Sequence, residues 1–189
     1  GKSATWYYTG KGGYYWAGAC VQNGYVVVGT DDGTANGNSS TARLLLLDAA
    51  TGRLCDSWDG LKGDIRSTVA HDNGAYYFTS KGGTFYGVRV DGETGTFCDK
   101  WSVDLVNGNG NMAMSTSSPS VYNGRAYIGL CGDGQFSAYS GHGIGVIDLT
   151  GWYLAYSVPT QGYPQTSGLL TTAYQADTGY VYIYFFDNY

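Results

Sequence analysis

Short apolar strands separated by glycine-containing turns recur along this chain at a spacing of fifty residues. Asn-Gly pairs stand at Asn23–Gly24, Asn73–Gly74 and Asn123–Gly124, and they are followed by the apolar runs YVVVGT, AYYFTS and RAYIGL. A fourth copy, Thr178–Gly179 followed by YVYIYF, lies fifty-five residues after the third. Asn-Gly between such runs is the strongest short signal for a β-hairpin. A repeat of this length predicts a modular β-architecture.

Each full copy predicts four antiparallel strands. A strand of small residues precedes the Asn-Gly turn, and the Tyr/Val-rich strand follows it. A polar loop then leads to a third strand, and a Thr-Gly turn joins that strand to the fourth. One such meander cannot bury both of its faces, whereas stacked copies can, so the pattern predicts an all-β propeller of four-stranded antiparallel blades. No segment of useful length has the apolar periodicity of a helix.

We expect residues 1–189 to form a single, partial propeller domain of about four blades, the last of them incomplete. The expected blades span residues 14–63, 64–111, 112–162 and 163–189, and an outer strand is expected at 4–8. Either this N-terminal strand closes the last blade of a small ring, or the chain is part of a longer propeller, which we favour. An incomplete blade leaves an unpaired strand edge, which we expect to promote homodimerisation by strand addition.

Composition narrows the classes of function. Hydrophobic residues make up 43% of the chain and charged residues only 13%, so a packed core is expected rather than disorder. The net charge is −5, and the ten Lys and Arg residues are not clustered, which argues against nucleic acids and acidic membranes as partners. No apolar run reaches the length of a membrane-spanning helix. The four cysteines form no CxxC motif, so we expect no zinc site.

The cysteines also occupy repeated positions. Cys55 and Cys98 are in matching register on the outer strands of adjacent blades, too far apart to be bridged, and we expect both to be free thiols packed as small apolar residues. Cys20 and Cys131 fall in different strand types of the first and third copies, and a bridge between them is left open.

Two stretches resemble the pyrroloquinoline-quinone-type, or quinoprotein-like, propeller repeat. SSPSVYNGRAYIG at 117–129 is similar to the inner strands of that repeat, and LDAATGRLCDSW at 47–58 resembles its Asp-Ala-x-Thr-Gly-Lys-x-x-Trp docking motif. A looser second instance lies at 83–95. The resemblance covers nearly the whole chain, and it implies the propeller fold.

The chain departs from the enzymes of that family. Members that hold the quinone carry about eight blades, a pair of neighbouring cysteines and a calcium site of acidic residues and Asn in the ring centre. This chain has fewer than five copies of the repeat and no adjacent cysteines. The resemblance therefore fits the non-catalytic scaffolds and cell-surface proteins of the family better, and we expect no cofactor.

One set of equivalent positions is the candidate binding site. Eight residues before each aligned turn glycine stand Trp16, Arg66, Thr116 and Thr171. In a propeller the innermost strands begin here, near the mouth of the central channel, so we expect these side chains to face a ligand. Trp16 and Arg66 suit stacking and hydrogen bonding to a sugar or peptide. The alternative is that they plug the channel or pair locally.

Other repeated residues are interpreted as structural. Trp58 and Trp101, six residues after their turn glycines, are expected to pack between blades. Asp48, Asp91 and Asp148 precede the Thr-Gly turns, and we interpret them as turn-forming residues.

Three polar features are interpreted as ordinary loop structure and not as binding sites. A loop with alternating oxygen donors is a weak calcium candidate without the spacing of an EF-hand: Asp31, Asp32, Asn36 and Asn38. We interpret it as a polar turn and expect no metal. His71 and His142 are expected to be exposed loop residues, and the Gly/Asn-rich segment at 107–111 is not a phosphate cradle because no helix follows it.

These features together favour a non-catalytic binding module of an extracellular or cell-surface bacterial protein, with a protein or carbohydrate as its ligand. Two alternatives stay open. One is a degenerate quinone-dependent enzyme, or a hydrolase with a site in the channel. The other is a structural spacer with no ligand of its own.

Overall fold

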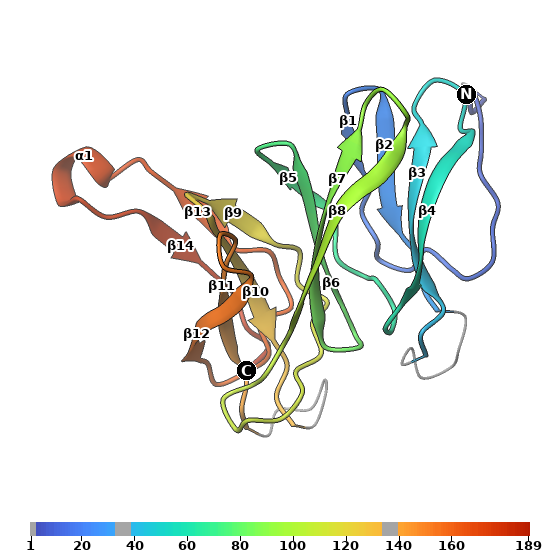
Figure 1. Cartoon of the computed structure of the whole chain (residues 1–189). Helices are drawn as coiled ribbons and strands as arrows, with labels where there is room; N and C mark the ends of the chain where they lie inside the picture. The colour runs from blue at the N-terminus through green and yellow to red at the C-terminus, as the bar shows by residue number, and fades with distance from the viewer. Residues whose placement is uncertain (1–2, 33–38, 134–139) are drawn as a thin grey trace.

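The computed structural model describes residues 3–32, 39–133 and 140–189 of the chain. They form three four-stranded antiparallel sheets and one two-stranded sheet, each built from consecutive strands (Figure 1). The first sheet contains β1 (Cys20–Gln22), β2 (Tyr25–Gly29), β3 (Ala42–Asp48) and β4 (Leu54–Leu61). The second contains β5 (Ala70–Asp72), β6 (Ala75–Ser80), β7 (Thr84–Asp91) and β8 (Thr96–Asp104). The third contains β9 (Ser120–Tyr122), β10 (Arg125–Leu130), β11 (Gly143–Asp148) and β12 (Tyr153–Pro159). The fourth contains β13 (Leu169–Thr171) and β14 (Tyr182–Tyr184).

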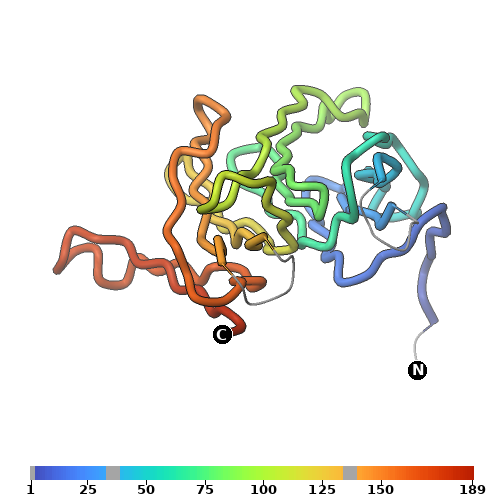
Figure 2. Tube along the Cα trace, turned by 90° about the horizontal axis from the view of Figure 1, so that it is seen from below, coloured from blue at the N-terminus to red at the C-terminus, as the bar shows by residue number. Residues whose placement is uncertain are grey.

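The sheets lie side by side as the blades of a fan. Viewed from below, the chain passes from one blade to the next in sequence order, so the first blade and the last sheet lie at opposite ends of the row (Figure 2). Each meander buries its faces against its neighbours, as expected from amphipathic sheets that cannot cover themselves. The arrangement is that of a β-propeller, and the predicted all-β fold is confirmed.

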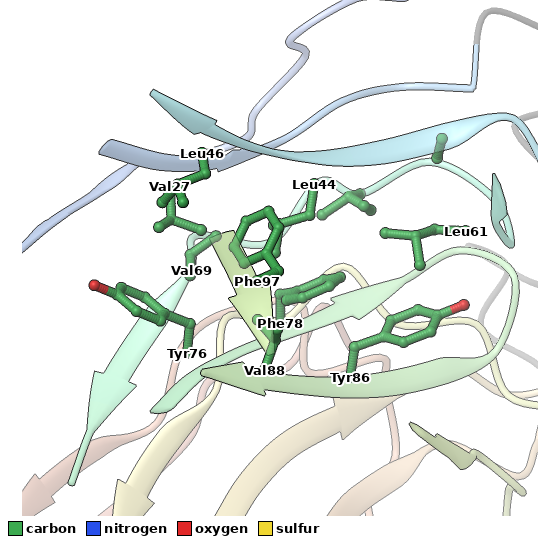
Figure 3. Packing of buried hydrophobic residues seen from close by; sticks show 12 residues of the cluster. Val27, Leu44, Leu46, Leu61, Val69, Tyr76, Phe78, Tyr86, Val88 and Phe97 are labelled. Carbon is green, nitrogen blue, oxygen red and sulfur yellow. The ribbon is translucent and has the colours of Figure 1, made fainter. Parts of the chain in front are cut away.

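Apolar side chains fill the two junctions between the full blades. Val27, Leu44 and Leu46 of the first blade meet Phe78 and Val88 of the second (Figure 3). Between the second and third blades the core contains Tyr77, Phe85, Ala126, Ile128 and Ile147, all buried. Because side chains alternate along a strand, successive residues of β6 serve opposite junctions.

The three Asn-Gly hairpins form as predicted. Asn23, Asn73 and Asn123 have φ of 52°, 46° and 48°, and the glycine after each is also at positive φ. Two consecutive residues in this region define the type I′ turn, whose twist matches that of the flanking strands. Register follows from the turns: Gln22 pairs with Tyr25, Asp72 with Ala75, and Tyr122 with Arg125.

The innermost strands begin later than the sequence predicts. They start at Cys20, Ala70 and Ser120, four residues after Trp16, Arg66 and Thr116. The intervening segments bond to neighbouring blades instead of forming a ladder of their own. The Val69 amide donates to the Gly18 carbonyl at 3.1 Å, and the Thr68 amide donates to Ser118 Oγ at 2.7 Å.

The fourth copy differs from the other three. A single helical turn, α1 (Gln175–Thr178), joins β13 to β14 and ends at Gly179, whose φ is 74°. The connection between Thr171 and Tyr182 is therefore ten residues long, in place of the two-residue turn of the other copies. Apolar periodicity could not predict this helix, because it is four residues long and buries none of them.

The N-terminal segment is the second difference. Residues 4–8 form no strand, although an outer strand was predicted there. Trp6 Nε1 donates to the Ala49 carbonyl at 3.0 Å, and the indole lies against Gly52 so closely that no side chain fits at that glycine. The segment thus lies on the first blade, and within one chain it does not close the last blade.

All four cysteines are free thiols, so the bridge left open between Cys20 and Cys131 is not formed. Cys131 is completely buried, next to Met114 and Tyr163. Among the described residues no helix is long and apolar enough to cross a bilayer.

Candidate functional site

The structure brings together two of the four predicted binding residues, Trp16 and Arg66. The Arg66 guanidinium carbon lies 5.5 Å from the centroid of the Trp16 ring and 4.9 Å from that of Tyr15. The two aromatic rings are themselves stacked, with centroids 4.9 Å apart and planes inclined by 30°. Sequence reasoning found Trp16 and Arg66 from the repeat but missed Tyr15, which the YYW run could have suggested.

The aromatic pair remains open to solvent. Tyr15 is 54% exposed and Trp16 58%, although each ring is in contact with Arg66. Trp16 also has a φ of 64°, in the left-handed region that bulky side chains rarely occupy. Such a conformation costs about 1–2 kcal/mol and tends to be retained at functional positions.

Beneath the rings lies a cluster of two acids and two bases. Arg66 Nη2 is 2.8 Å from Asp64 Oδ2 and 3.4 Å from Asp31 Oδ2, and Lys81 Nζ is 3.3 Å from Asp64 Oδ2. Asp64 is almost completely buried, and its Oδ1 accepts the Asp32 amide at 3.0 Å. The charges of Asp31, Asp64, Arg66 and Lys81 balance one another, so buried charge is paired as its desolvation requires.

Asp31 is the least well stabilised carboxylate of this charged cluster. Burial raises the pKa of its carboxyl, the Asp64 charge raises it further, and the Arg66 guanidinium partly offsets both effects. Asp31 Oδ1 and Arg66 Nε are buried without a hydrogen-bond partner. The cluster therefore has hydrogen-bonding capacity that the described protein groups do not use.

A cleft adjoins this cluster through Asp31. It measures about 420 Å³, and its lining includes Lys11, Asp32, Thr41 and Arg43 besides Asp31. Arg43 Nη2 donates to the Lys11 carbonyl at 3.0 Å, which ties the N-terminal segment to the first blade at this point. Asp31 thus links the two features, because it lines the cleft and is paired with Arg66, which contacts both aromatic rings.

Thr116 and Thr171 are not part of the site. The Thr116 amide donates to Tyr163 Oη at 2.7 Å, and Thr116 is buried. Thr171 is the last residue of β13, where its hydroxyl accepts the Ala173 amide. Arg66 and Thr116 both stand four residues before an innermost strand, and the residue four before β13 is Gln165. The extra residues between β13 and β14 shift the alignment, so counting back from Gly179 led to Thr171 instead of Gln165.

The repeated residues interpreted as structural lie at turns and junctions. Trp58 meets Tyr86 of the next blade edge-on at 5.4 Å, and Trp101 meets Trp152 of the third blade. The three repeated aspartates accept turn amides through Oδ1: Asp48 from Thr51, Asp91 from Glu93, and Asp148 from Thr150.

The calcium candidate does not assemble over the described residues. Asp31 is paired with Arg66, and Asp32 Oδ2 accepts the Ser39 amide at 2.6 Å. Asn36 and Asn38 lie outside the described residues. Within the described ranges no group of three or more His, Cys, Asp and Glu residues is placed to hold a metal ion.

Both histidines differ from the expectation that they are exposed loop residues. His142 is buried, stacks on Tyr163 at 6.0 Å, and accepts the Gly132 amide through Nδ1 at 2.6 Å. His71 lies in β5, half-buried against Tyr76, with its Nε2 buried and unpartnered. The sequence around an isolated histidine does not indicate whether its side chain is buried, because tertiary packing determines its exposure.

A second polar cluster was missed from the sequence. Asp133 accepts side-chain amides from Asn107, Asn109 and Asn111 at 2.7, 2.6 and 2.9 Å. These three bonds hold the pKa of the Asp133 carboxyl below its usual range. The alternation NGNGN was the available signal, since it places three amides on one side of a turn-rich segment.

Comparison with solved structures supports the fold. The chain is similar to the computationally designed Ika4 protein, at 18% identity and a TM-score of 0.55 over 93% of this chain and 94% of that one. It is similar to the quinohemoprotein alcohol dehydrogenase ADHIIG from Pseudomonas putida HK5, at 18% identity and a TM-score of 0.58, over 90% of this chain. The Dos1 propeller matches at 16% identity and a TM-score of 0.55, over 73% of this chain.

These likenesses show the propeller fold and nothing finer. The chain spans 29% of the dehydrogenase and 33% of the Dos1 propeller chain. No family model matches the sequence, and no curated protein matches it. Quinoprotein and other propellers are thus structural neighbours of this chain.

Proposed function

We propose that this chain is a non-catalytic binding module of an extracellular or cell-surface bacterial protein, and that its ligand is a neutral carbohydrate. The observation that carries the proposal is the exposed Tyr15–Trp16 pair held over Arg66. Rigid propeller faces suit recognition, because ligand-contacting segments are fixed by the blades beneath them.

The chemistry of the site favours a sugar among the ligands considered. The C–H faces of a sugar ring are apolar and pack on aromatic rings, while its edges carry hydroxyl groups that need polar partners. Tyr15 and Trp16 offer exposed rings. The charges of the cluster beneath them are already paired, which gives an ionic ligand little net attraction.

A glycan array tests the proposal, with the Tyr15→Ala/Trp16→Ala double variant beside the unmodified chain. We expect a small set of neutral glycans to be retained, and the double variant to lose at least about tenfold in affinity, equal to 1.4 kcal/mol. Tyr7→Ala is the matched control, because Tyr7 is 84% exposed in the same N-terminal segment. Equal glycan binding by the double variant and the unmodified chain would contradict the proposed site. Binding on a protein array but not on the glycan array would indicate a protein ligand. No binding on either array would favour a structural spacer.

A quinone-dependent enzyme is the second candidate, and the quinohemoprotein neighbour favours it. The residues at the centre fit that cofactor poorly. The oxygens of the buried Asp64 carboxylate are taken by the Asp32 amide, Arg66 and Lys81, so a calcium ion would meet two cations at once. Titration with pyrroloquinoline quinone and Ca²⁺, followed by absorbance, is expected to give no saturable spectral change.

A further inference from the structure

The last sheet presents an uncovered face that its counterparts bury. Val27 of β2 and Tyr77 of β6 point toward the following blade and are buried there. Tyr184 of β14 occupies the equivalent position and is 48% exposed, and Tyr182, two residues earlier on the same face, is 37% exposed. Leu169, which pairs with Tyr184 across the sheet, is 67% exposed. Exposed apolar side chains in such a row mark an interaction surface.

The opposite face of the same sheet is turned toward the third blade. Ile183 and Leu170, paired with each other, line a groove of about 410 Å³ with Tyr122, Arg125 and Tyr127 of the third blade. The side of β13–β14 that faces back along the chain is therefore set against its neighbour. The side that carries Leu169, Tyr182 and Tyr184 has no blade on it (Figure 1).

The first blade is open in the complementary way. Tyr76 and Phe78 of β6 point to the preceding blade and are buried, whereas the equivalent Val26 and Val28 of β2 are only half-buried. Val21, which pairs with Val26 on β1, is 64% exposed. The inner two strands of this blade thus lack the cover that the inner strands of the other full blades have.

The outer half of that same face is covered. Leu45 and Leu47 of β3 pair with Val28 and Val26, so they share this face, yet both are buried. The N-terminal segment runs along this side of the first blade, and Trp6 is fixed there by its bond to Ala49 (Figure 1). What remains open is a strip two strands wide, and the uncovered sheet at the other end is two strands wide.

We propose that a second copy of this chain fills both openings. The Leu169–Tyr182–Tyr184 face of β13–β14 in one copy packs on the Val21–Val26–Val28 face of β1–β2 in the other, and the same contact repeats reciprocally. Because the two open ends lie on opposite sides of the fan, two copies related by a twofold axis make two identical junctions and close one ring (Figure 2).

Three observations carry the choice of a second copy. The contact reproduces a junction that the chain already makes twice between its own blades, in the same strand register. The six contact residues carry no charge, so burying them leaves no unpaired ion. The segment that holds Trp6 covers the outer half of the junction and leaves the inner half clear.

Sedimentation velocity and light scattering on the chain at micromolar concentration test the proposal. We expect a species of twice the 20.2 kDa chain mass. Tyr182→Asp/Tyr184→Asp should weaken the dimer by at least about 100-fold, because it buries two unpaired charges in each junction. Met112→Asp is the matched control, since Met112 is 56% exposed on a loop of the second blade and should leave the dimer intact.

A crosslinking experiment tests which ends meet. In chains whose half-buried Cys20, Cys55 and Cys98 are replaced by serine, one set carries Val21→Cys and the other Leu169→Cys. The two sets are mixed and oxidised, and the mixture should give far more covalent dimer than either chain alone. A monomer at all concentrations would overturn the proposal. The proposal would also be overturned if Tyr182→Asp/Tyr184→Asp left the dimer unchanged while circular dichroism showed that the variant is folded. A crosslink that forms equally well between identical chains would overturn it too.

Discussion

The indole rings of Trp101 and Trp152 stack across the junction between the second and third blades, with centroids 4.5 Å apart and planes inclined by 11°. Trp101 comes from the outer strand β8, and Trp152 directly follows the turn glycine of the next blade. Trp6 meets Gly52 of the first blade in a related way. Indole on turn is therefore a recurring outer contact between neighbouring units of this chain.

The tryptophan pair gives the first prediction. Trp101→Ala and Trp152→Ala should each lower the free energy of unfolding by about 1–3 kcal/mol, and the double variant should lose about 1 kcal/mol less than the sum, because stacked aromatics contribute beyond their buried area. Urea unfolding of the four proteins measures the coupling. Trp101→Ala combined with Trp16→Ala, far away, serves as an additive control. A coupling within about 0.3 kcal/mol of zero would contradict the stacking.

Gly87 leads to a second prediction at the same junction. A Cβ at Gly87 would lie 2.3 Å from the Trp152 ring, well inside van der Waals contact. Gly87→Ala should therefore displace Trp152 and lower the free energy of unfolding by about 1–3 kcal/mol. This loss is expected even though alanine is normally more favourable than glycine inside a strand. Gly92→Ala, where a Cβ meets nothing within 4 Å, is the control. If both substitutions have the same small effect in urea unfolding, the close contact is absent in solution.

Cys131 is predicted to be inert in the folded protein. Burial raises the pKa of its thiol to about 12, so almost no thiolate forms near pH 8, and no atom of the residue reaches solvent. In a chain that keeps Cys131 alone, with serine at the other three positions, a coloured disulfide reagent should react only as fast as the protein unfolds. The matched chain keeping Cys55 alone should react faster, because Cys55 is half-exposed. Equal rates in the two chains would contradict the burial of Cys131.

Asp133 predicts a loss of stability in acid. Its folded pKa lies below the ordinary value because three asparagine amides bond to the carboxylate, so its contribution is present above that ordinary value and is lost as pH falls through the folded pKa. Asp133→Asn should lower the urea midpoint at pH 6 and have a smaller effect at pH 3. Asp177→Asn on α1, whose residues are exposed, is the control. An effect of equal size at both pH values would show that the bonds do not depend on the charge.

Trp16 separates stability from binding. In Trp16→Gly the left-handed conformation costs nothing, but the unfolded chain gains flexibility, so the free energy of unfolding should change by less than about 1 kcal/mol. Carbohydrate affinity should nevertheless fall, because half of the aromatic surface is gone. Thermal unfolding and glycan binding on the same sample measure both. A large loss of stability would mean that Trp16 is retained for packing.

The repeating part of the fold could be predicted from sequence because its signals are local. Asn73–Gly74 dictates a turn through backbone conformations that few other residues adopt, and the apolar runs beside it fix the register. The place of Trp6 could not be predicted this way, since nothing in ATWYY indicates which blade the segment contacts. That choice depends on the non-local fit of its indole to Gly52.

The candidate site was predicted in part. Trp16 and Arg66 share a repeat position, and repeat positions converge at the centre of a fan, so their proximity follows from topology. Thr171 was misplaced because the hairpin of the fourth copy contains α1 and is not equivalent to the others. Asp64 is paired with Arg66, which is close in sequence, and with Lys81, seventeen residues further along the chain. No spacing rule identifies such ion pairs before the loop conformation is known.

The placing of the second blade between two full neighbours has a consequence for how the molecule opens. In the monomeric chain, units that contact only the units beside them lose structure from the ends inward, since a terminal unit gives up one interface and a central unit two. The sheet of β13 and β14, with three residues per strand, should exchange its amide protons first, and β6, buried along its whole length, should exchange last. A gradient of protection would then run along the chain, with its maximum near Phe78.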